Sequence, residues 1–193
     1  TDTPSTRFFV QPARPCAVSS LTAARPPAVG RLAEPLRADR SACDRVRDRH
    51  TLVCKRFGAD DVANASTPPS RPDAFSRLRE DLRPLLADTP PFEAAITGID
   101  AFERPASGTG PVVYLAVESD ALVRLHRRLC AAFDPVPAIE GDAYVPHVTL
   151  ARGGSPDAAK RAVGGLDEPI RWRAHALDLY DPEFREVAAT IAL

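Results

Sequence analysis

The chain has 193 residues, of which 44% are hydrophobic, and its 25 basic and 26 acidic side chains give a formal net charge of −1. This length can bury the core of one domain, and the charge balance excludes a bulk attraction to nucleic acid, so a nucleic-acid substrate would need a local basic patch. No apolar run approaches the roughly 18 residues of a membrane span, the first residues lack the basic-then-apolar layout expected of a signal peptide, and there is no C-x-x-C pair. We therefore expect a soluble, cytoplasmic protein that does not contact membranes. We also expect a monomer that needs neither a metal nor another cofactor.

The N-terminal part of the chain has few regular patterns because prolines interrupt it repeatedly. Residues 7–10 (Arg-Phe-Phe-Val) favour a short strand, and residues 27–37 favour a short helix that Gly30 and Pro35 weaken. We interpret residues 1–26 as an irregular or disordered segment and residues 27–193 as a single domain.

Regular elements are predicted more clearly from residue 49 onward. Alternation and aromatic or β-branched content predict strands, and apolar residues at spacings of three and four predict helices. Pro84 is expected to bend or end its helix early. The expected elements are a strand at 49–55, an exposed loop at 58–72, a helix at 73–87, strands at 92–99 and 111–117, and a helix at 120–133.

The C-terminal third contains three more strands and a helix. The first strand, 144–152, ends at Gly153-Gly154, and Ser155-Pro156-Asp157 is a typical helix start for a helix that runs to about residue 163. Two strands, 170–179 and 186–193, complete the chain. Since strands and helices alternate without a parallel βαβ repeat, we predict an α+β fold.

The segment with the clearest chemical character is Tyr144-Val145-Pro146-His147-Val148-Thr149-Leu150-Ala151-Arg152. Alternate residues of a strand share a face, so His147 and Thr149 would point to one side and Val148 and Leu150 into the core. A proton-transfer group would then lie beside a hydroxyl donor, which suits a phosphate. Arg152 could hold a phosphate as well.

A second histidine next to a threonine lies in the first half of the chain, at Arg49-His50-Thr51. Each half contains a helix, strands and one such pair. Two related lobes that face each other would bring His50 and His147 to one cleft.

These motifs and their order resemble the 2H phosphoesterase superfamily, which includes the 2′-5′ RNA ligases and the RNA 2′,3′-cyclic phosphodiesterases. The resemblance is carried by Pro146-His147-Val148-Thr149-Leu150-Ala151-Arg152 and, before it, by Gly98-Ile99-Asp100-Ala101-Phe102 and Val112-Val113-Tyr114-Leu115-Ala116-Val117. It covers residues 73–193 well, 45–58 in part and 1–44 poorly. It implies two pseudo-symmetric lobes of antiparallel sheet around a central cleft, with a His-x-Thr motif on each of two facing strands.

The first motif departs from this pattern because His50 and Thr51 are adjacent. In a regular strand they would face opposite ways. Either His50 occupies the histidine position, or Thr51 keeps the hydroxyl position and Arg49 replaces the histidine. A β-bulge could present both His50 and Thr51.

The resemblance implies a metal-independent phosphoesterase for 2′,3′-cyclic phosphate ends of RNA or nucleotides. One of His50 and His147 would deprotonate water and the other would protonate the leaving oxygen, while Thr149 and Thr51 would donate hydrogen bonds to the phosphate. Arg152 and Arg49 would bind substrate. The alternative is a non-catalytic protein that binds nucleotides or RNA ends through a degenerate first motif.

Overall fold

The computed structural model describes residues 19–38, 43–58, 71–182 and 184–193. Their elements alternate between strands and helices, as expected. In chain order they are β1 (Ser19–Ala23), α1 (Val29–Leu32), α2 (Glu34–Ala38), β2 (Arg45–Val46), β3 (Leu52–Phe57), α4 (Arg71–Leu86), β4 (Phe92–Phe102), β5 (Val112–Glu118), α5 (Asp120–Ala132), the 3-10 helix η1 (Gly141–Ala143), β6 (His147–Arg152), α6 (Pro156–Ala162), β7 (Gly164–Ala174), β8 (Ala176–Asp181) and β9 (Glu186–Ala192).

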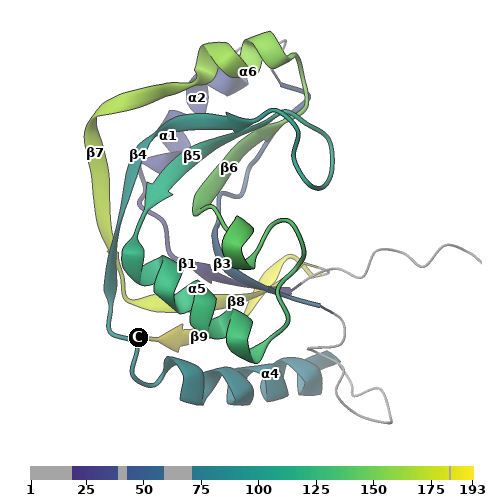
Figure 1. The fold of residues 1–193 in the computed structure, drawn as a ribbon, viewed down its shortest axis with the longest axis vertical. Coiled ribbons are helices and arrows are strands. Elements are labelled where there is room, and N and C mark those ends of the chain that lie inside the picture. The colour runs from purple at the N-terminus through teal and green to yellow at the C-terminus, as the bar shows by residue number, and fades with distance from the viewer. Residues whose placement is uncertain (1–18, 39–42, 59–70, 183) are drawn as a thin grey trace, which may run out of the picture.

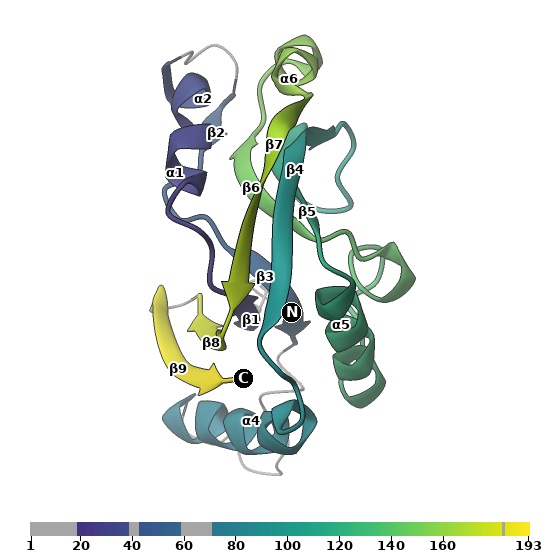
Figure 2. The same cartoon turned by 90° about the vertical axis from the view of Figure 1, so that its left-hand side faces the viewer.

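The strands of the described residues form one antiparallel sheet in the order β7-β4-β5-β6-β3-β1-β8-β9, and β2 pairs with β6. Figure 1 shows its two halves: β4, β5, β6 and β7 in the upper half, and β1, β3, β8 and β9 in the lower half. Helices α1, α2 and α6 lie at the end of the upper half, and α4 and α5 lie beside the lower half (Figures 1 and 2). The predicted α+β class with a large antiparallel sheet is confirmed.

The two halves meet at the centre of the sheet, where β3 lies beside β6. Leu52 of β3 is directly opposite Val148 of β6, and both side chains are completely buried. Because directly opposite residues of antiparallel strands point to the same face, this pair shows which face of the seam is the core.

The helices follow the predicted apolar spacing and start signals. Helix α4 buries Phe75, Leu78, Leu82 and Leu86, which recur every three or four residues. It also continues past Pro84 to Leu86, so of the two effects expected of Pro84, a bend or an early end, the early end was wrong. Pro84 is exposed, so water can solvate the carbonyl that loses its hydrogen bond.

Hydroxyl side chains cap the next two helices. Ser119 Oγ accepts a hydrogen bond from the backbone N–H of Leu122 at the start of α5, and Ser155 Oγ accepts one from Ala158 at the start of α6. These bonds satisfy N–H groups that have no partner within the helix. The predicted start of α6 at Ser155-Pro156 is confirmed.

The structure differs from the predictions mainly near the chain's beginning and end. Residues 19–23 lie in the segment interpreted as irregular, yet they form β1 between β3 and β8. Their local pattern is weak, and pairing on both edges stabilises the strand instead. The strand expected at 170–179 is divided at His175 between β7 and β8. The strand expected at 7–10 and most of the loop expected at 58–72 lie outside the described residues.

No helix in the described ranges is both long enough and apolar enough to cross a membrane.

Candidate functional site

His147 is the first residue of β6, and its imidazole is oriented by the backbone just before it. Nδ1 lies 2.7 Å from the carbonyl oxygen of Val145. Because a carbonyl can only accept, Nδ1 carries the proton and Nε2 keeps its lone pair in the neutral ring. The rings of Phe102 and Tyr114 contact the imidazole edge-on, each with a centroid distance of 5.3 Å.

The electrostatic surroundings keep His147 neutral. Burial lowers the pKa of its imidazole from the usual 6.5, the nearby Arg56 and Arg152 lower it further, and the bond to Val145 opposes them. A neutral ring with a free Nε2 can accept a proton from water near neutral pH.

Two β-bulges turn Arg56 and Arg152 toward the same side as His147. In β6 the pairing with β5 skips Leu150, and in β3 the pairing with β1 skips Cys54. A bulge shifts the inside–outside alternation by one residue. Arg56 and Arg152 are therefore half-exposed, although regular strands would have pointed them into the core.

His147, Arg56 and Arg152 line a pocket with a volume of about 440 Å³. Two further arginines, Arg47 and Arg104, line it too, so the pocket lining contains four arginines and one histidine. The walls come from the β4–β5 connection and from the segment around η1, which project from the same side of the sheet in Figure 1. Such a cluster of planar cations is suited to phosphate.

A buried carboxylate supports Arg56 from behind the pocket. Glu140 Oε1 accepts a hydrogen bond of 2.6 Å from the backbone N–H of Arg56 and lies 3.9 Å from its guanidinium, while Oε2 lies 2.8 Å from Lys55 Nζ. The side chains of Lys55 and Glu140 are both fully buried. Oε2 also accepts from the N–H of Val136, so Glu140 connects the pocket wall to the bulge of β3.

The structure brings only part of the predicted set of site residues together. His147 and Arg152 line the pocket, and Thr149 lies half-buried on the same face of β6. His50 does not line it: the residue is only 3% exposed, and Nδ1 lies 3.3 Å from the carbonyl oxygen of Thr149. His50 Nε2 is buried without a hydrogen-bond partner among the described residues. Burial lowers the pKa of this imidazole, so His50 is neutral as well.

The other two residues of the first motif also lie outside the pocket lining. Arg49 is exposed, and its guanidinium carbon lies 4.1 Å from the centre of the Tyr180 ring. Thr51 is half-buried. When β3 and β6 are aligned on their bulges, Thr51 corresponds to His147 and Val53 to Thr149. The two strands thus share a backbone pattern while only β6 carries the His-x-Thr side chains.

Sequence reasoning missed Arg47, Arg56 and Arg104. A signal for Arg56 does exist, because Arg56-Phe57-Gly58 and Arg152-Gly153-Gly154 each place an arginine two residues before a glycine. Counting back from the glycines would have aligned the strands correctly. Arg47 and Arg104 lie near the pocket only through the fold, and no local motif marks them.

Two aromatic side chains near the pocket make structural contacts. His126 is completely buried, with Nδ1 bonded to the carbonyl of Cys54 and Nε2 accepting the N–H of Gly141. Tyr144 stacks on His126 at a centroid distance of 3.7 Å and donates its hydroxyl to the carbonyl of Val53. These contacts attach the η1 segment to β3.

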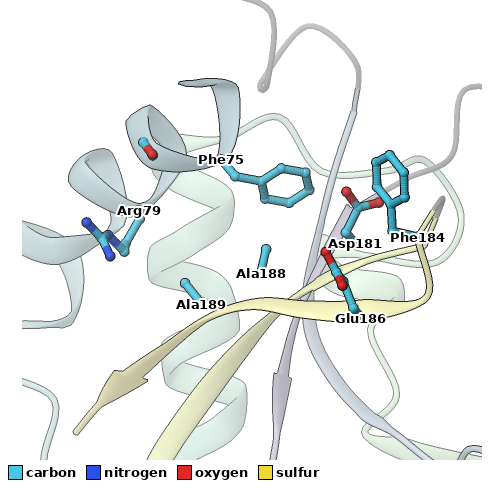
Figure 3. Close-up of a pocket in the computed structure, with 8 residues that line it drawn as sticks. Phe75, Arg79, Asp181, Phe184, Glu186, Ala188 and Ala189 are labelled. Atoms are coloured by element: carbon cyan, nitrogen blue, oxygen red, sulfur yellow. The ribbon is translucent and has the colours of Figure 1, made fainter. Parts of the chain in front are cut away.

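A second hollow of about 370 Å³ lies between α4 and the strands β8 and β9. Figure 3 shows Phe75 of α4 pointing toward the strands, where Asp181 and Glu186 lie. Its lining includes no histidine and carries charges of both signs. We therefore place the candidate site around His147.

Comparison with known families identifies the chain. A family model described as the 2′-5′ RNA ligase superfamily matches residues 62–183. The chain belongs to this superfamily. The matched range includes His147, Thr149 and Arg152 and begins after β3.

Among solved structures, the superfamily member is similar to TT0787 of Thermus thermophilus. The two are 18% identical with a TM-score of 0.61, and the similarity covers 91% of this chain and 97% of TT0787. At this identity the likeness shows the fold alone. The search of curated proteins returned no match.

Proposed function

We propose that this protein is a phosphoesterase that opens 2′,3′-cyclic phosphate ends of RNA or nucleotides without a metal ion. The observation that supports the proposal is a neutral His147, with Nε2 unprotonated, in a pocket that carries four guanidinium groups. Membership of the superfamily supports a phosphoesterase-type reaction in general, and the cyclic phosphate is our specific proposal.

His147 is the general base in this scheme. Nε2 takes a proton from water as the water oxygen bonds to phosphorus. The phosphorus bond to the 2′ or 3′ oxygen then breaks on the opposite side, this oxygen takes a proton from solvent water, and the imidazolium releases its proton to solvent, leaving one phosphate monoester. The two-imidazole version needs His50 in the pocket, and His50 is buried elsewhere.

Arginines replace the charge that a second imidazolium would supply. Arg56 and Arg152 are the two cations that act on His147. They would neutralise the negative charge that builds on the non-bridging oxygens of the phosphate. The hydroxyl of Thr149, on the same face as His147, donates a further hydrogen bond. Thr51 occupies the position that corresponds to His147 and is the second candidate donor.

The test is turnover of a nucleoside 2′,3′-cyclic phosphate by the purified protein in EDTA. We expect a single monophosphate isomer, and we expect His147→Ala to lower kcat by about 100-fold or more, the usual contribution of a general acid–base group. His50→Ala should leave kcat nearly unchanged where it folds. The exposed His175→Ala is the matched control.

Two outcomes would overturn this scheme. Absence of turnover by the wild-type protein, or full activity of His147→Ala, would contradict the proposed reaction. A folded His50→Ala that is as inactive as His147→Ala would restore the two-imidazole mechanism.

The burial of His50 supports a second candidate function, a protein that binds nucleotides or RNA ends without turnover. It predicts binding of the cyclic nucleotide with no product. It also predicts that Arg49→Ala weakens binding more than His50→Ala does, because Arg49 is exposed and His50 is not.

A further inference from the structure

The hydrogen bond to Val145 does not by itself fix the imidazole of His147. The bond is exposed to solvent, so water can replace either partner at little cost in free energy. The torsion that turns a histidine ring is broad and roughly two-fold. A half-turn about it would exchange the places of Nδ1 and Cδ2 and so break the bond that sets which nitrogen is protonated. Other contacts must therefore hold the ring.

Backbone pairing places only small side chains directly beside the imidazole. His147 lies opposite Ala116 of β5, and Ala116 lies opposite Gly98 of β4. Directly opposite residues of antiparallel strands point to the same face. The cross-strand neighbours of the imidazole are thus a methyl group and a glycine, which are too small to restrain a ring. The restraint has to come from positions further along the strands.

Two aromatic rings at such positions contact the imidazole. Tyr114 lies two residues before Ala116 on β5, and Phe102 is the last residue of β4. Their rings stack on each other with centroids 4.2 Å apart. Each centroid lies 5.3 Å from that of His147, at interplanar angles of 64° for Tyr114 and 86° for Phe102. Edge-to-face contacts of this kind are favourable beyond the area that they bury.

A hydrogen bond at the far end of Tyr114 holds the pair of rings. Asp100 lies directly opposite Tyr114, and the Tyr114 hydroxyl donates to Asp100 Oδ2 at 3.1 Å. Asp100 Oδ1 accepts the N–H of Ala101 at 2.7 Å, so the carboxylate is itself held in place. Tyr114 is 5% exposed and does not line the pocket, whereas Phe102 does. Tyr114 can therefore act on a ligand only through the side chains that it contacts.

We propose that Tyr114 and Phe102 are positioning residues that together hold the imidazole of His147 in the orientation that keeps Nδ1 on the carbonyl of Val145. Without these rings the imidazole would turn, and the proton would distribute over both nitrogens. Fewer molecules would then have Nε2 free to accept a proton. This inference rests on the proposed function, because it takes His147 to be the general base.

Nitrogen-15 NMR of the imidazole reads the positioning without turnover. At alkaline pH we expect one protonated and one unprotonated nitrogen resonance for His147, assigned by their loss in His147→Ala. In folded Tyr114→Leu the two shifts should move toward each other, because the two tautomers exchange. Phe102→Leu, which replaces a half-buried residue, should act in the same direction and carries the test where Tyr114→Leu does not fold.

Phe92→Leu is the matched control for loss of a ring. Phe92 is 5% exposed, like Tyr114, and lies at the other end of β4 from Phe102. Both nitrogen shifts of His147 should stay at their wild-type values in this variant. A general loosening of the sheet is thereby separated from loss of the two ring contacts.

Turnover separates positioning from substrate binding. Tyr114→Leu should lower kcat by about tenfold, the equivalent of one favourable aromatic contact. KM should stay near the wild-type value, because Tyr114 does not line the pocket. Tyr114→Phe keeps the ring and loses only the bond to Asp100, so it should retain most of the wild-type kcat.

Two results would overturn the inference. One is a pair of nitrogen shifts that stays unchanged in folded Tyr114→Leu and Phe102→Leu. The other is a raised KM with an intact kcat in Tyr114→Leu, which would place this ring in binding instead. A wild-type protein without turnover, whose shifts nevertheless converge in Tyr114→Leu, would contradict the proposed function and support the positioning role.

Discussion

His147 and His50 differ in their access to the pocket, and this access decides what each imidazole can do. Both lie beside the central seam of the sheet, and both have a lowered pKa because of burial. His147 lines the pocket, whereas His50 is turned inward, where its Nε2 has no partner among the described residues. In the proposed mechanism the first exchanges protons with a substrate, and the second does not.

The pH dependence of turnover follows from a single titrating imidazole. Burial and two neighbouring guanidiniums lower the pKa of His147 below 6.5, so the base is active at neutral pH and is lost only as the pH falls through that lowered value. We expect kcat/KM to rise through one ionisation and then stay level across pH 7 to 8. A bell-shaped profile with two limbs near neutrality would instead indicate two imidazoles.

Arg56→Gln provides a check on the cause of this pKa. Removing one of the two cations that disfavour the imidazolium should move the acid limb of the profile to higher pH. An unchanged limb would mean that Arg56 does not contribute to the lowered pKa of His147.

At the scale of elements, the bulges of β3 and β6 shape the site. Each bulge adds one unpaired residue and so presents an arginine that a regular strand would bury. The β3 bulge is stabilised by the Lys55–Glu140 pair, since Glu140 also accepts the N–H groups of Arg56 and Val136. Buried charges need such satisfied partners.

We predict that Glu140→Gln is strongly destabilising. Glutamine keeps the shape but removes the charge that pairs with Lys55, and its amide cannot accept at both oxygen positions. Leaving a buried ammonium uncompensated should lower the free energy of unfolding by about 3–5 kcal/mol. Denaturant unfolding measures this change.

The exposed Glu118→Gln, at the end of β5, is the matched control and should change stability little. If Glu140→Gln were as stable as the wild type, the pair would not stabilise the bulge. In folded Glu140→Gln we also expect KM to rise more than kcat falls, because Arg56 loses its support while His147 does not.

At the scale of the whole molecule, the histidines couple folding to pH. His50, His126 and His147 all have pKa values lowered by burial. The unfolded chain binds protons at these residues below pH 6.5, before the folded protein does. The free energy of unfolding should therefore decrease as the pH falls from about 6.5 through the lowered folded-state values.

Thermal unfolding between pH 7 and 5 tests this, since most carboxylates titrate below that range. Each unit between folded and unfolded pKa values is worth about 1.4 kcal/mol per histidine. His126→Gln should weaken the pH dependence, and His175→Ala, which replaces an exposed residue, should leave it unchanged. A melting temperature that is constant over this range would contradict the prediction.

Much of the fold could be predicted from local patterns. The apolar spacing of α4 and α5, the serine caps of α5 and α6 and the strand after Tyr144 all depend on residues close together in sequence. The succession of strands and helices without a parallel βαβ repeat predicted the α+β class, and the order of motifs around His147 predicted the family. β1 was missed because its pairing on both edges, and not its own five residues, stabilises it.

The sequence by itself determined the family, and it suggested the chemistry that we propose for His147, because the motif from Pro146 to Arg152 is local and complete. Only the tertiary structure decided which side chains from β3 share the pocket with His147. The bulge at Cys54 depends on pairing with β1 and on Glu140, far away in the chain, and it presents Arg56 while His50 stays buried. The face of the sheet to which a side chain points depends on the strand's register with its neighbours. That register is a property of the whole sheet.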